Sequence, residues 1–493
     1  MLKRILFTAT LVALLAPGLA LAAPSVTGGS NGFTIKEGVD DAVLKQIKEG
    51  LGQVKPGQLT FRLQKVTDAD LEKIVAAYPD LVGLGIESSP AVTKLDPLAK
   101  IKKLQTLQLE KINAADLAPL ANLTDLLKVK IKNCKSIASL AGLAKATKIT
   151  DLEIADIAAT DATPLAGLTE LTRLVIDIRF NDLKWMAKMG ELTYITLSGG
   201  KNPISLEGLP SLPSMKQIAL KRVAPTDLAP LAAALPNLTK IDFNGAVLPD
   251  LTPLTQLAKL DDLDLYGATL KDFSPLAGCP SLKKVNYYAT KDANYSTLGT
   301  LTQVEDLQGG LTKLDDISWI AKLPKLKKLQ LFAEYITDYS PLSKSAIEEL
   351  KIWNMRKPVG DLGFLAGMTS LKKLELTGEL NDLTNFNALA GLSNLKLLKI
   401  TNVNVKSGEP VLLPSLAKLT LLTELDLSRS KVGNLDGVAG AAALEKIDLR
   451  NCTDLKSLDP LKKLPKLKRV NVTKDAFTPE QLAGFPESVK VIQ

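Results

Sequence analysis

Short apolar phrases of the form Leu-x-x-Leu-x-Leu recur along most of the chain. One runs over Leu104, Leu107 and Leu109, and the next begins at Leu126. Apolar and polar positions alternate inside each phrase, which is the pattern of a short β-strand. Because equally spaced strands lie side by side when their units stack, the pattern predicts a parallel sheet. Most steps between phrases are 21–24 residues, and the phrases begin at residues 81, 104, 126, 149, 171, 192, 215, 238, 260, 282, 304, 326, 347, 371, 395, 422, 444 and 467.

Many of the segments between these strands contain Asp-x-x-Pro-Leu. An Asp ahead of a short apolar run favours the N-cap of a helical turn. A Pro in the first turn is tolerated, because its missing N–H has no partner there in any case. Each unit is therefore expected to be a strand, a bend and a short helical or extended return leg. The Asp and Pro pairs are Asp116 and Pro119, Asp161 and Pro164, Asp227 and Pro230, Asp250 and Pro253, Asp272 and Pro275, and Asp338 and Pro341.

The period and the two phrases resemble the bacterial internalin-type leucine-rich repeat of roughly 22 residues. This resemblance implies an α/β-type leucine-rich-repeat solenoid, a curved horseshoe with a parallel sheet on its concave face and short return legs. The chain departs from the family at one position, eight residues after each start, where the family carries Asn. Only Cys134, Ser430 and Cys452 match the residues that the family accepts there in place of Asn.

Four segments follow from these patterns: a signal peptide at 1–22, a leader and N-terminal cap at 23–80, the repeat array at 81–472 and a C-terminal cap at 473–493. Residues 23–38 are rich in Gly, Ser and Thr and are expected to be mobile. The cap is predicted to contain helices at 40–51 and 68–78, the second with Asp68 as its N-cap, and a strand at 59–63. The C-terminal cap should contain a helix beginning at Pro479 and a strand at 489–492. Residues 403–410, in the longest unit, are predicted to form a protruding loop.

The first residues have the features of a secretory signal. Lys3 and Arg4 precede an apolar core at 5–15, and Ala20 and Ala22 form an Ala-x-Ala site, so cleavage is expected before Ala23. The alternative is a membrane anchor, but the apolar core is too short to span a bilayer. We therefore expect an exported protein without a transmembrane segment, located in the periplasm, the medium or at the cell surface.

The chain contains three cysteines and no histidine. Cys134 and Cys452 occupy the same repeat position fourteen units apart, on the order of 65 Å at strand spacing, so they cannot form a disulfide within one solenoid. Cys279 lies on a return leg, away from both. All three are expected to be buried structural thiols. Because histidine is absent and no metal-ligand spacing is present, no metal, cofactor or catalytic cysteine is expected.

The formal net charge is +8. A basic excess can indicate binding to nucleic acid when it is concentrated on one surface. Here the exposed strand positions carry nearly equal numbers of basic and acidic residues, and the excess lies elsewhere. The distribution therefore does not favour a nucleic-acid partner.

One exposed column of the predicted sheet is rich in aromatic residues. Six residues after successive starts stand Tyr266, Tyr288, Gly310, Phe332 and Trp353. Aromatic residues make up only 4% of the chain, so four in one column is a concentration. Aromatic side chains often dominate binding energy at protein interfaces. The column therefore predicts a partner-binding site on the concave face.

Three aspartates, Asp242, Asp262 and Asp264, are expected beside this column. The carboxyl groups of Asp242 and Asp264 fall at the same offset in neighbouring units, a spacing that could suit a retaining glycosidase. Any two acids at matching offsets would have the same spacing. The favoured hypothesis is therefore a monomeric, non-enzymatic scaffold that binds a protein partner. Glycan binding through the same aromatic residues is the main alternative, and a hydrolase that uses the paired carboxylates is a remote one.

Overall fold

The computed structural model describes two compact units, one ending at Asp242 and the other beginning at Phe243. The predicted signal peptide and residues 405–409 of the predicted loop lie outside the described residues. The described residues are 24–30, 32–55, 57–178, 182–198, 203–310, 313–353, 355, 362–381, 386–404 and 410–493.

Unit 1 is built on a sheet in which every neighbouring pair of strands is parallel except the antiparallel pair β1–β2. Unit 1 also contains a separate two-stranded parallel sheet, formed by β10 (Pro203–Ile204) and β12 (Ala224–Pro225). The sheet strands, in spatial order, are β1 (Ser25–Gly29), β2 (Gly32–Lys36), β3 (Thr60–Gln64), β4 (Gly83–Ser89), β5 (Thr106–Ile112), β6 (Lys128–Lys132), β7 (Asp151–Ala155), β8 (Arg173–Asp177), β9 (Tyr194–Ser198), β11 (Gln217–Lys221) and β13 (Lys240–Asp242).

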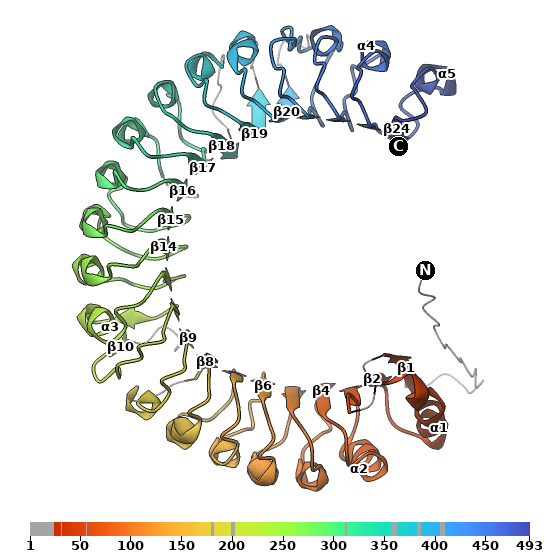
Figure 1. Ribbon diagram of the computed structural model, residues 1–493, viewed down its shortest axis with the longest axis vertical. Coiled ribbons are helices and arrows are strands. Elements are labelled where there is room, and N and C mark those ends of the chain that lie inside the picture. Colours follow the sequence, from red (N-terminus) through yellow and green to blue (C-terminus); the bar gives the residue numbers. More distant parts are fainter. Residues whose placement is uncertain are drawn as a thin grey trace. The chain divides into compact units, whose positions relative to one another are not determined.

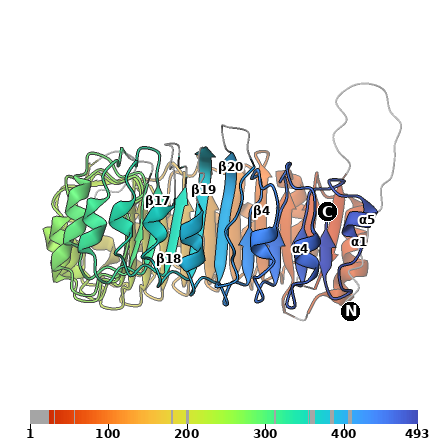
Figure 2. The ribbon, with the colours of Figure 1, turned by 90° about the horizontal axis from the view of Figure 1, so that it is seen from above.

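In unit 2 each strand pairs in parallel with the strand of the next repeat. Figure 2 shows β17 to β20 side by side in this arrangement. The strands are β14 (Asp262–Asp264), β15 (Lys284–Asn286), β16 (Asp306–Gln308), β17 (Lys328–Phe332), β18 (Glu349–Trp353), β19 (Lys373–Asn381), β20 (Leu397–Asn404), β21 (Glu424–Asp426), β22 (Lys446–Asp448), β23 (Arg469–Asn471) and β24 (Lys490–Ile492).

Short helical segments form the return legs, and within each unit they lie on the side opposite the strands (Figure 1). Among the described residues, none of the helices has the length and apolar character needed to cross a membrane. The α-helices are α1 (Asp41–Gly50), α2 (Asp68–Ala77), α3 (Ala229–Ala234), α4 (Asp459–Lys462) and α5 (Pro479–Leu482). The 3₁₀ turns are η1 (Leu51–Gln53), η2 (Asp96–Lys100), η3 (Ala118–Asn122), η4 (Ala141–Leu143), η5 (Thr163–Gly167), η6 (Lys184–Met186), η7 (Thr252–Gln256), η8 (Ser274–Gly278), η9 (Tyr295–Thr300), η10 (Ser318–Lys322), η11 (Ser340–Leu342), η12 (Gly363–Leu365), η13 (Asn387–Gly391) and η14 (Asp436–Val438).

The recurring return-leg aspartates start these turns, but one residue earlier than an N-cap does. Asp116 accepts a hydrogen bond of 2.8 Å from the backbone N–H of Ala118, the first residue of η3. Asp250 accepts one of 2.9 Å from the N–H of Thr252, the first residue of η7. Hydrogen bonds from the backbone and side chain of Thr252 hold the pKa of Asp250 below its ordinary value. The aspartate thus satisfies one of the N–H groups that the turn leaves unpaired.

The core consists of the phrase leucines and the apolar residues of the return legs. Leu104, Leu107 and Leu109, for example, are all at least 99% buried. The side chains of neighbouring repeats fill the space between the sheet and the return legs, so no single repeat has a core of its own. Burial along β5 to β8 alternates as the strand pattern predicts. These observations confirm the fold class, a leucine-rich-repeat solenoid.

At three repeats, the residue eight positions after the start of the phrase is a Cys or Ser, namely Cys134, Ser430 and Cys452. Cys134 donates from Sγ to the carbonyl oxygen of Lys132 at 3.2 Å, and Cys452 donates to that of Leu427 at 3.2 Å. Ser430 accepts from the backbone N–H of Val403 at 3.2 Å. A thiol or hydroxyl therefore pairs with backbone groups at the bend, which must be satisfied because they are buried.

The N-terminal segment is more ordered than the sequence analysis expects. Strands β1 and β2 form an antiparallel pair where the sequence analysis expects a mobile leader, because Phe33 and Ile35 are buried and β2 pairs with β3. The predicted helices and strand of the cap are present as α1, α2 and β3. Asp68 is not the N-cap of α2: Thr67 is, in a capping box with Asp70. In the C-terminal segment, α5 and β24 confirm the predicted helix and strand.

Candidate functional site

The predicted aromatic column forms one continuous row on unit 2, which we call the aromatic ridge (Tyr266, Tyr288, Phe332 and Trp353). The rings of Tyr266 and Tyr288 are stacked, with centroids 5.3 Å apart and an angle of 15° between planes. Tyr288 meets Phe332 edge to face at 6.2 Å. Phe332 and Trp353 are register partners on β17 and β18. Tyr266 is 41% exposed and the other three are partly exposed, so the ridge faces solvent.

The stacking geometry determines which part of each ring a partner can reach. The centroid separation of Tyr266 and Tyr288 is close to the spacing of adjacent strands, about 4.8 Å. Their ring planes must therefore stand across the strand-to-strand direction, with the facing surfaces covering each other. At the interface between the two rings, edges and hydroxyl groups are therefore what a partner can reach. Burial, and secondarily the nearby Tyr266, raise the pKa of Tyr288 above its ordinary value.

Two glycines allow the ridge to continue past the repeat that lacks an aromatic residue. A Cβ on Gly310 would lie 1.9 Å from the Cβ of Phe332, and Gly310 has φ +142°, a conformation that favours glycine. A Cβ on Gly309 would lie 1.9 Å from Cζ of the buried Tyr287. Gly310 therefore makes room for Phe332, and Gly309 makes room for the aromatic core beneath the ridge.

Asp264 supports the ridge through its hydrogen bonds. Its Oδ1 accepts from the backbone N–H of Tyr266 at 2.9 Å and from Nδ2 of Asn286 at 3.0 Å. Asn286 repeats the arrangement, since its Oδ1 accepts from the backbone N–H of Tyr288 at 3.0 Å. The two polar side chains end β14 and β15 and fix the backbone from which both tyrosines project. Asp264 is therefore a positioning residue for the ridge.

The other two predicted site aspartates lie in ion pairs. Asp242, on β13 of unit 1, has an oxygen 3.1 Å from Nζ of Lys221. Asp262, on β14 of unit 2, has one 3.8 Å from Nζ of Lys284. Asp242 thus belongs to unit 1, and Asp264 belongs to unit 2.

Asp262 begins a row of alternating charges that we call the charge ladder. Its members are register partners on neighbouring strands from β14 to β19, and acidic and basic residues alternate. Like charges at these neighbouring positions would repel each other. Ion pairs join Lys328 to Glu349 at 3.0 Å and Lys373 to Glu349 at 3.5 Å. Along these strands the face is therefore self-neutralised. The members are Asp262, Lys284, Asp306, Lys328, Glu349 and Lys373.

Trp353 ends the ridge and has a cation beside its ring. Nζ of Lys351 lies 4.4 Å from the ring centroid, within the range of a cation–π interaction. The same ammonium group lies 3.3 Å from a carboxylate oxygen of Glu375 on the next strand. Lys351 therefore holds the indole against the sheet and connects the ridge to β19.

The predicted structural thiols are all free and buried. Burial raises the pKa of Cys279 and of Cys452 to about 11, and it also raises the pKa of Cys134. These thiols are not activated as nucleophiles, since the thiolate is the reactive form. The described part of the chain contains no group of three or more His, Cys, Asp or Glu residues that could hold a metal ion.

Three residues of this surface were absent from the sequence-based prediction. Asn286 could have been found, because it has the same offset as Asp264 one repeat later. The roles of Lys351 and Gly309 depend on side-chain packing across repeats and have no pattern in the sequence alone.

Comparison of the sequence with known protein families and with curated proteins finds no match. Comparison of the fold finds many solved leucine-rich-repeat structures, and these agree with the fold class derived above. The TLR13 chain of a TLR13–ssRNA13 complex is similar over 90% of this chain and 65% of its own, a little under two thirds, with 19% identity and a TM-score of 0.59.

Two bacterial structures are also similar. The similarity to an internalin from Listeria monocytogenes extends over 83% of this chain and 90% of the internalin chain, with 18% identity and a TM-score of 0.31. The similarity to the leucine-rich-repeat protein LIC12759 of Leptospira interrogans extends over 92% of this chain and 93% of that protein's chain, with 13% identity and a TM-score of 0.37.

Proposed function

We propose that this protein is an exported, non-enzymatic scaffold that binds a protein partner through the aromatic ridge on the concave face of its sheet. The observation that carries the proposal is the ridge itself: four aromatic side chains in one column of unit 2, all at least partly exposed, with ring contacts from Tyr266 through Tyr288 to Phe332 and with Trp353 as the register partner of Phe332. Contiguous exposed aromatic surface of this kind is typical of interaction sites.

The ring geometry favours a protein over a glycan. A sugar ring typically packs on the flat face of an aromatic side chain, and Tyr266 and Tyr288 cover each other's facing surfaces. Lys351 lies over the ring of Trp353. Edges and hydroxyl groups are what remain for contact along the tyrosine pair, and these suit the mixed apolar and polar surface of a protein.

The hydrolase alternative is disfavoured by the contacts of the acid that would serve it. Asp264 uses Oδ1 for two hydrogen bonds that hold Tyr266 and Asn286. A general acid or nucleophile must be positioned toward a substrate atom instead. Export rests on the signal-like residues 1–22 of the sequence.

The test is affinity capture from extracts and culture medium of the source cells, with quantitative mass spectrometry. The native protein is compared with a Tyr288→Ala/Trp353→Ala double variant. Tyr335→Ala is the matched control, because Tyr335 is 43% exposed but is not part of the ridge. All variants are first shown to have native circular dichroism.

The expected result is one set of proteins retained by the native chain and by Tyr335→Ala and lost from the double variant. Replacing central interface aromatics costs about 2 kcal/mol or more each, roughly a 30-fold loss of affinity. Equal capture by all three forms would show that the ridge is not the binding site. Release of sugar fragments from a glycan panel by the native protein would contradict the non-enzymatic proposal.

A further inference from the structure

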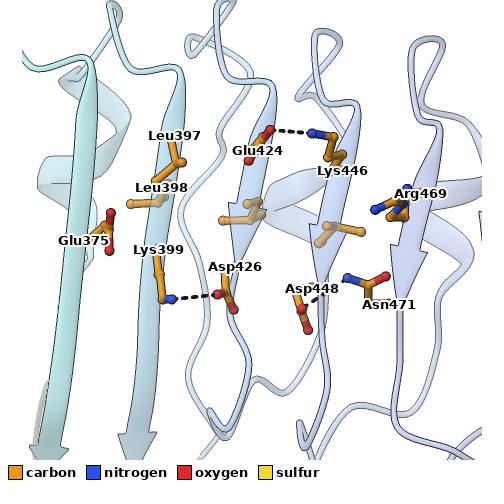
Figure 3. Close-up of a pocket in the computed structure, with 12 residues that line it drawn as sticks. Glu375, Leu397, Leu398, Lys399, Glu424, Asp426, Lys446, Asp448, Arg469 and Asn471 are labelled. Carbon is orange, nitrogen blue, oxygen red and sulfur yellow. Dashed lines mark hydrogen bonds and ion pairs between the residues drawn. The ribbon is translucent and has the colours of Figure 1, made fainter. Parts of the chain in front are cut away.

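A shallow pocket of about 300 Å³ lies on the same face of unit 2, just beyond the end of the ridge. Side chains of β19 to β23 line it, beginning with Glu375 on the strand next to that of Trp353. Figure 3 shows these side chains projecting from successive strands. The pocket and the ridge are thus consecutive parts of one strand surface.

The charge ladder ends in this pocket. Leu397 follows Lys373 at the next register position and puts an apolar side chain where the ladder has charges. Beyond Glu424, the column continues as Lys446, Arg469 and Lys490 on β22, β23 and β24. Alternation is therefore lost, and three cations occupy neighbouring positions.

The carboxylates of the pocket are already paired. Glu375 lies 3.3 Å from Lys351, Glu424 lies 2.7 Å from Lys446, and Asp426 lies 3.5 Å from Lys399. Asp448 lies 2.6 Å from Arg450, which is just outside the pocket lining. Each acid thus has its own cation, and the lysines that line the pocket are committed to these pairs.

Arg469 is the cation that is left over. Within the described residues it has no ion pair or hydrogen bond from its side chain, and the same holds for Lys490, its register partner on β24. Both side chains are exposed. In Figure 3 the links join Glu424 to Lys446, Lys399 to Asp426 and Asp448 to Asn471, whereas Arg469 stands apart from them. The guanidinium group keeps its full set of donors.

We propose that Arg469, assisted by Lys490, binds a carboxylate of the partner polypeptide, an Asp or Glu side chain that follows the segment seated on the aromatic ridge. This inference rests on the proposed function and adds the chemistry of the partner. A guanidinium group binds a carboxylate in a two-bond fork, and an apolar residue such as Leu397 supports the aliphatic part of the same segment. A phosphate dianion suits the pocket less well, because the four acids and three cations that line it leave no positive excess to balance a second negative charge.

The spacing of the two subsites defines the partner further. Trp353 on β18 and Arg469 on β23 are five strand spacings apart, about 24 Å at 4.8 Å each. Arg469 is in the register column of Glu349, four residues before Trp353, which adds about 13 Å along the strand and gives a separation of about 27 Å. An extended polypeptide advances about 3.3 Å per residue, so the acid should follow the last ridge-bound apolar residue by about eight residues.

A phage-displayed library of random dodecapeptides, selected on the full-length protein, tests this. The expected peptides combine aromatic or aliphatic residues with an Asp or Glu about eight positions away. Selections on Arg469→Gln should keep the apolar residues and lose the acids. Selections on Tyr288→Ala/Trp353→Ala should lose the apolar residues and keep the acids. Lys463→Gln, which removes an exposed charge at the end of α4, is the matched control and should select the same peptides as the native protein.

The affinity of one selected peptide, labelled with fluorescein, is then measured by anisotropy. Arg469→Gln should weaken binding about 10- to 100-fold, the effect of one charge-assisted contact. Changing the peptide's acid to its amide should weaken binding of the native protein equally and that of Arg469→Gln little. Inorganic phosphate should compete poorly.

Three results would overturn the inference: selected peptides without acids, acid enrichment that survives Arg469→Gln, or strong competition by phosphate. A failure of the proposed function would give a different result. Peptides selected on the native protein would then lack the apolar residues, or these residues would persist in peptides selected on the Tyr288→Ala/Trp353→Ala variant.

Discussion

Replacing Tyr by Phe should have opposite effects on the free energy of unfolding at two neighbouring residues beneath the ridge, Tyr287 and Tyr295. Tyr287 is fully buried among Phe273, Tyr295 and Trp319, and within the described residues its hydroxyl has no hydrogen-bond partner. The hydroxyl of Tyr295 donates to the carbonyl oxygen of Thr290 at 2.8 Å. The same substitution, Tyr to Phe, therefore removes an unsatisfied group in one case and a hydrogen bond in the other.

The magnitudes follow from these environments. Burying a hydroxyl without a partner costs about 1–3 kcal/mol, so Tyr287→Phe should raise the free energy of unfolding by up to about 1 kcal/mol once the ring's slightly changed packing is included. Tyr295→Phe leaves the Thr290 carbonyl without this donor and should lower the free energy of unfolding by about 1–2 kcal/mol. The two variants should thus differ by about 1–3 kcal/mol, although each lacks a single oxygen.

Equilibrium unfolding in urea, followed by circular dichroism at neutral pH, measures the difference. Both tyrosines belong to unit 2, so the same unfolding transition reports on both. The midpoint should move up for Tyr287→Phe and down for Tyr295→Phe, with an unchanged slope. A destabilised Tyr287→Phe would show that this hydroxyl is hydrogen-bonded and would refute the reasoning from its burial.

Further predictions concern the support of the ridge and the buried thiols. Asp264→Ala should weaken partner binding and lower stability by about 1–3 kcal/mol, whereas Asp264→Asn, which keeps an acceptor for the N–H of Tyr266, should cost less; equal effects of the two variants on unfolding would exclude a positioning role. Gly309→Ala should lower the free energy of unfolding by about 1–3 kcal/mol or more in urea titrations, because the new Cβ would overlap the enclosed ring of Tyr287. An unchanged free energy of unfolding would mean that the ring of Tyr287 can move away from the new Cβ. The thiol reagent DTNB should label no cysteine of the native protein at neutral pH and three after denaturation, and any native labelling would contradict their burial. Because the folded-state pKa of Cys279 is raised from 9.0 to about 11, its contribution to stability is complete below pH 9 and is lost between about pH 9 and 11; in Cys279→Ala the fall in unfolding free energy over that window should be smaller, and an unchanged pH dependence would be evidence against the shift.

The repeat itself follows from the sequence because its signal is local and redundant. The Leu-x-x-Leu-x-Leu phrase predicts both the strand and its buried side, and equal spacing places the phrases in register. The aromatic ridge follows for the same reason: residues at one offset must lie in one column, so the offset alone groups Tyr266, Tyr288, Phe332 and Trp353. The burial of the three thiols follows from the same kind of argument.

Other features depend on contacts that no repeat position encodes. Strands β1 and β2 lie in a segment whose composition is typical of a mobile one, and their order comes from the pairing of β2 with β3 and from the burial of Phe33. Asp68 is a residue type that favours a helix N-cap, and it lies at the start of the helical pattern. Thr67, however, has the extended backbone and the side-chain geometry that an N-cap requires. In both cases the deciding interactions involve neighbours whose positions the local sequence does not specify.

The sequence by itself determined that this protein is a leucine-rich-repeat solenoid and which residues share a column, because periodicity translates directly into position. Only the tertiary structure decided what each column can do. It showed that Asp264 accepts a hydrogen bond from the backbone N–H of Tyr266, that the stacked tyrosines cover each other's facing surfaces, and that Arg469 alone lacks a partner among the charges lining its pocket. The physical reason is that offset fixes which residues are neighbours, whereas hydrogen bonds and ion pairs depend on side-chain directions and distances across repeats.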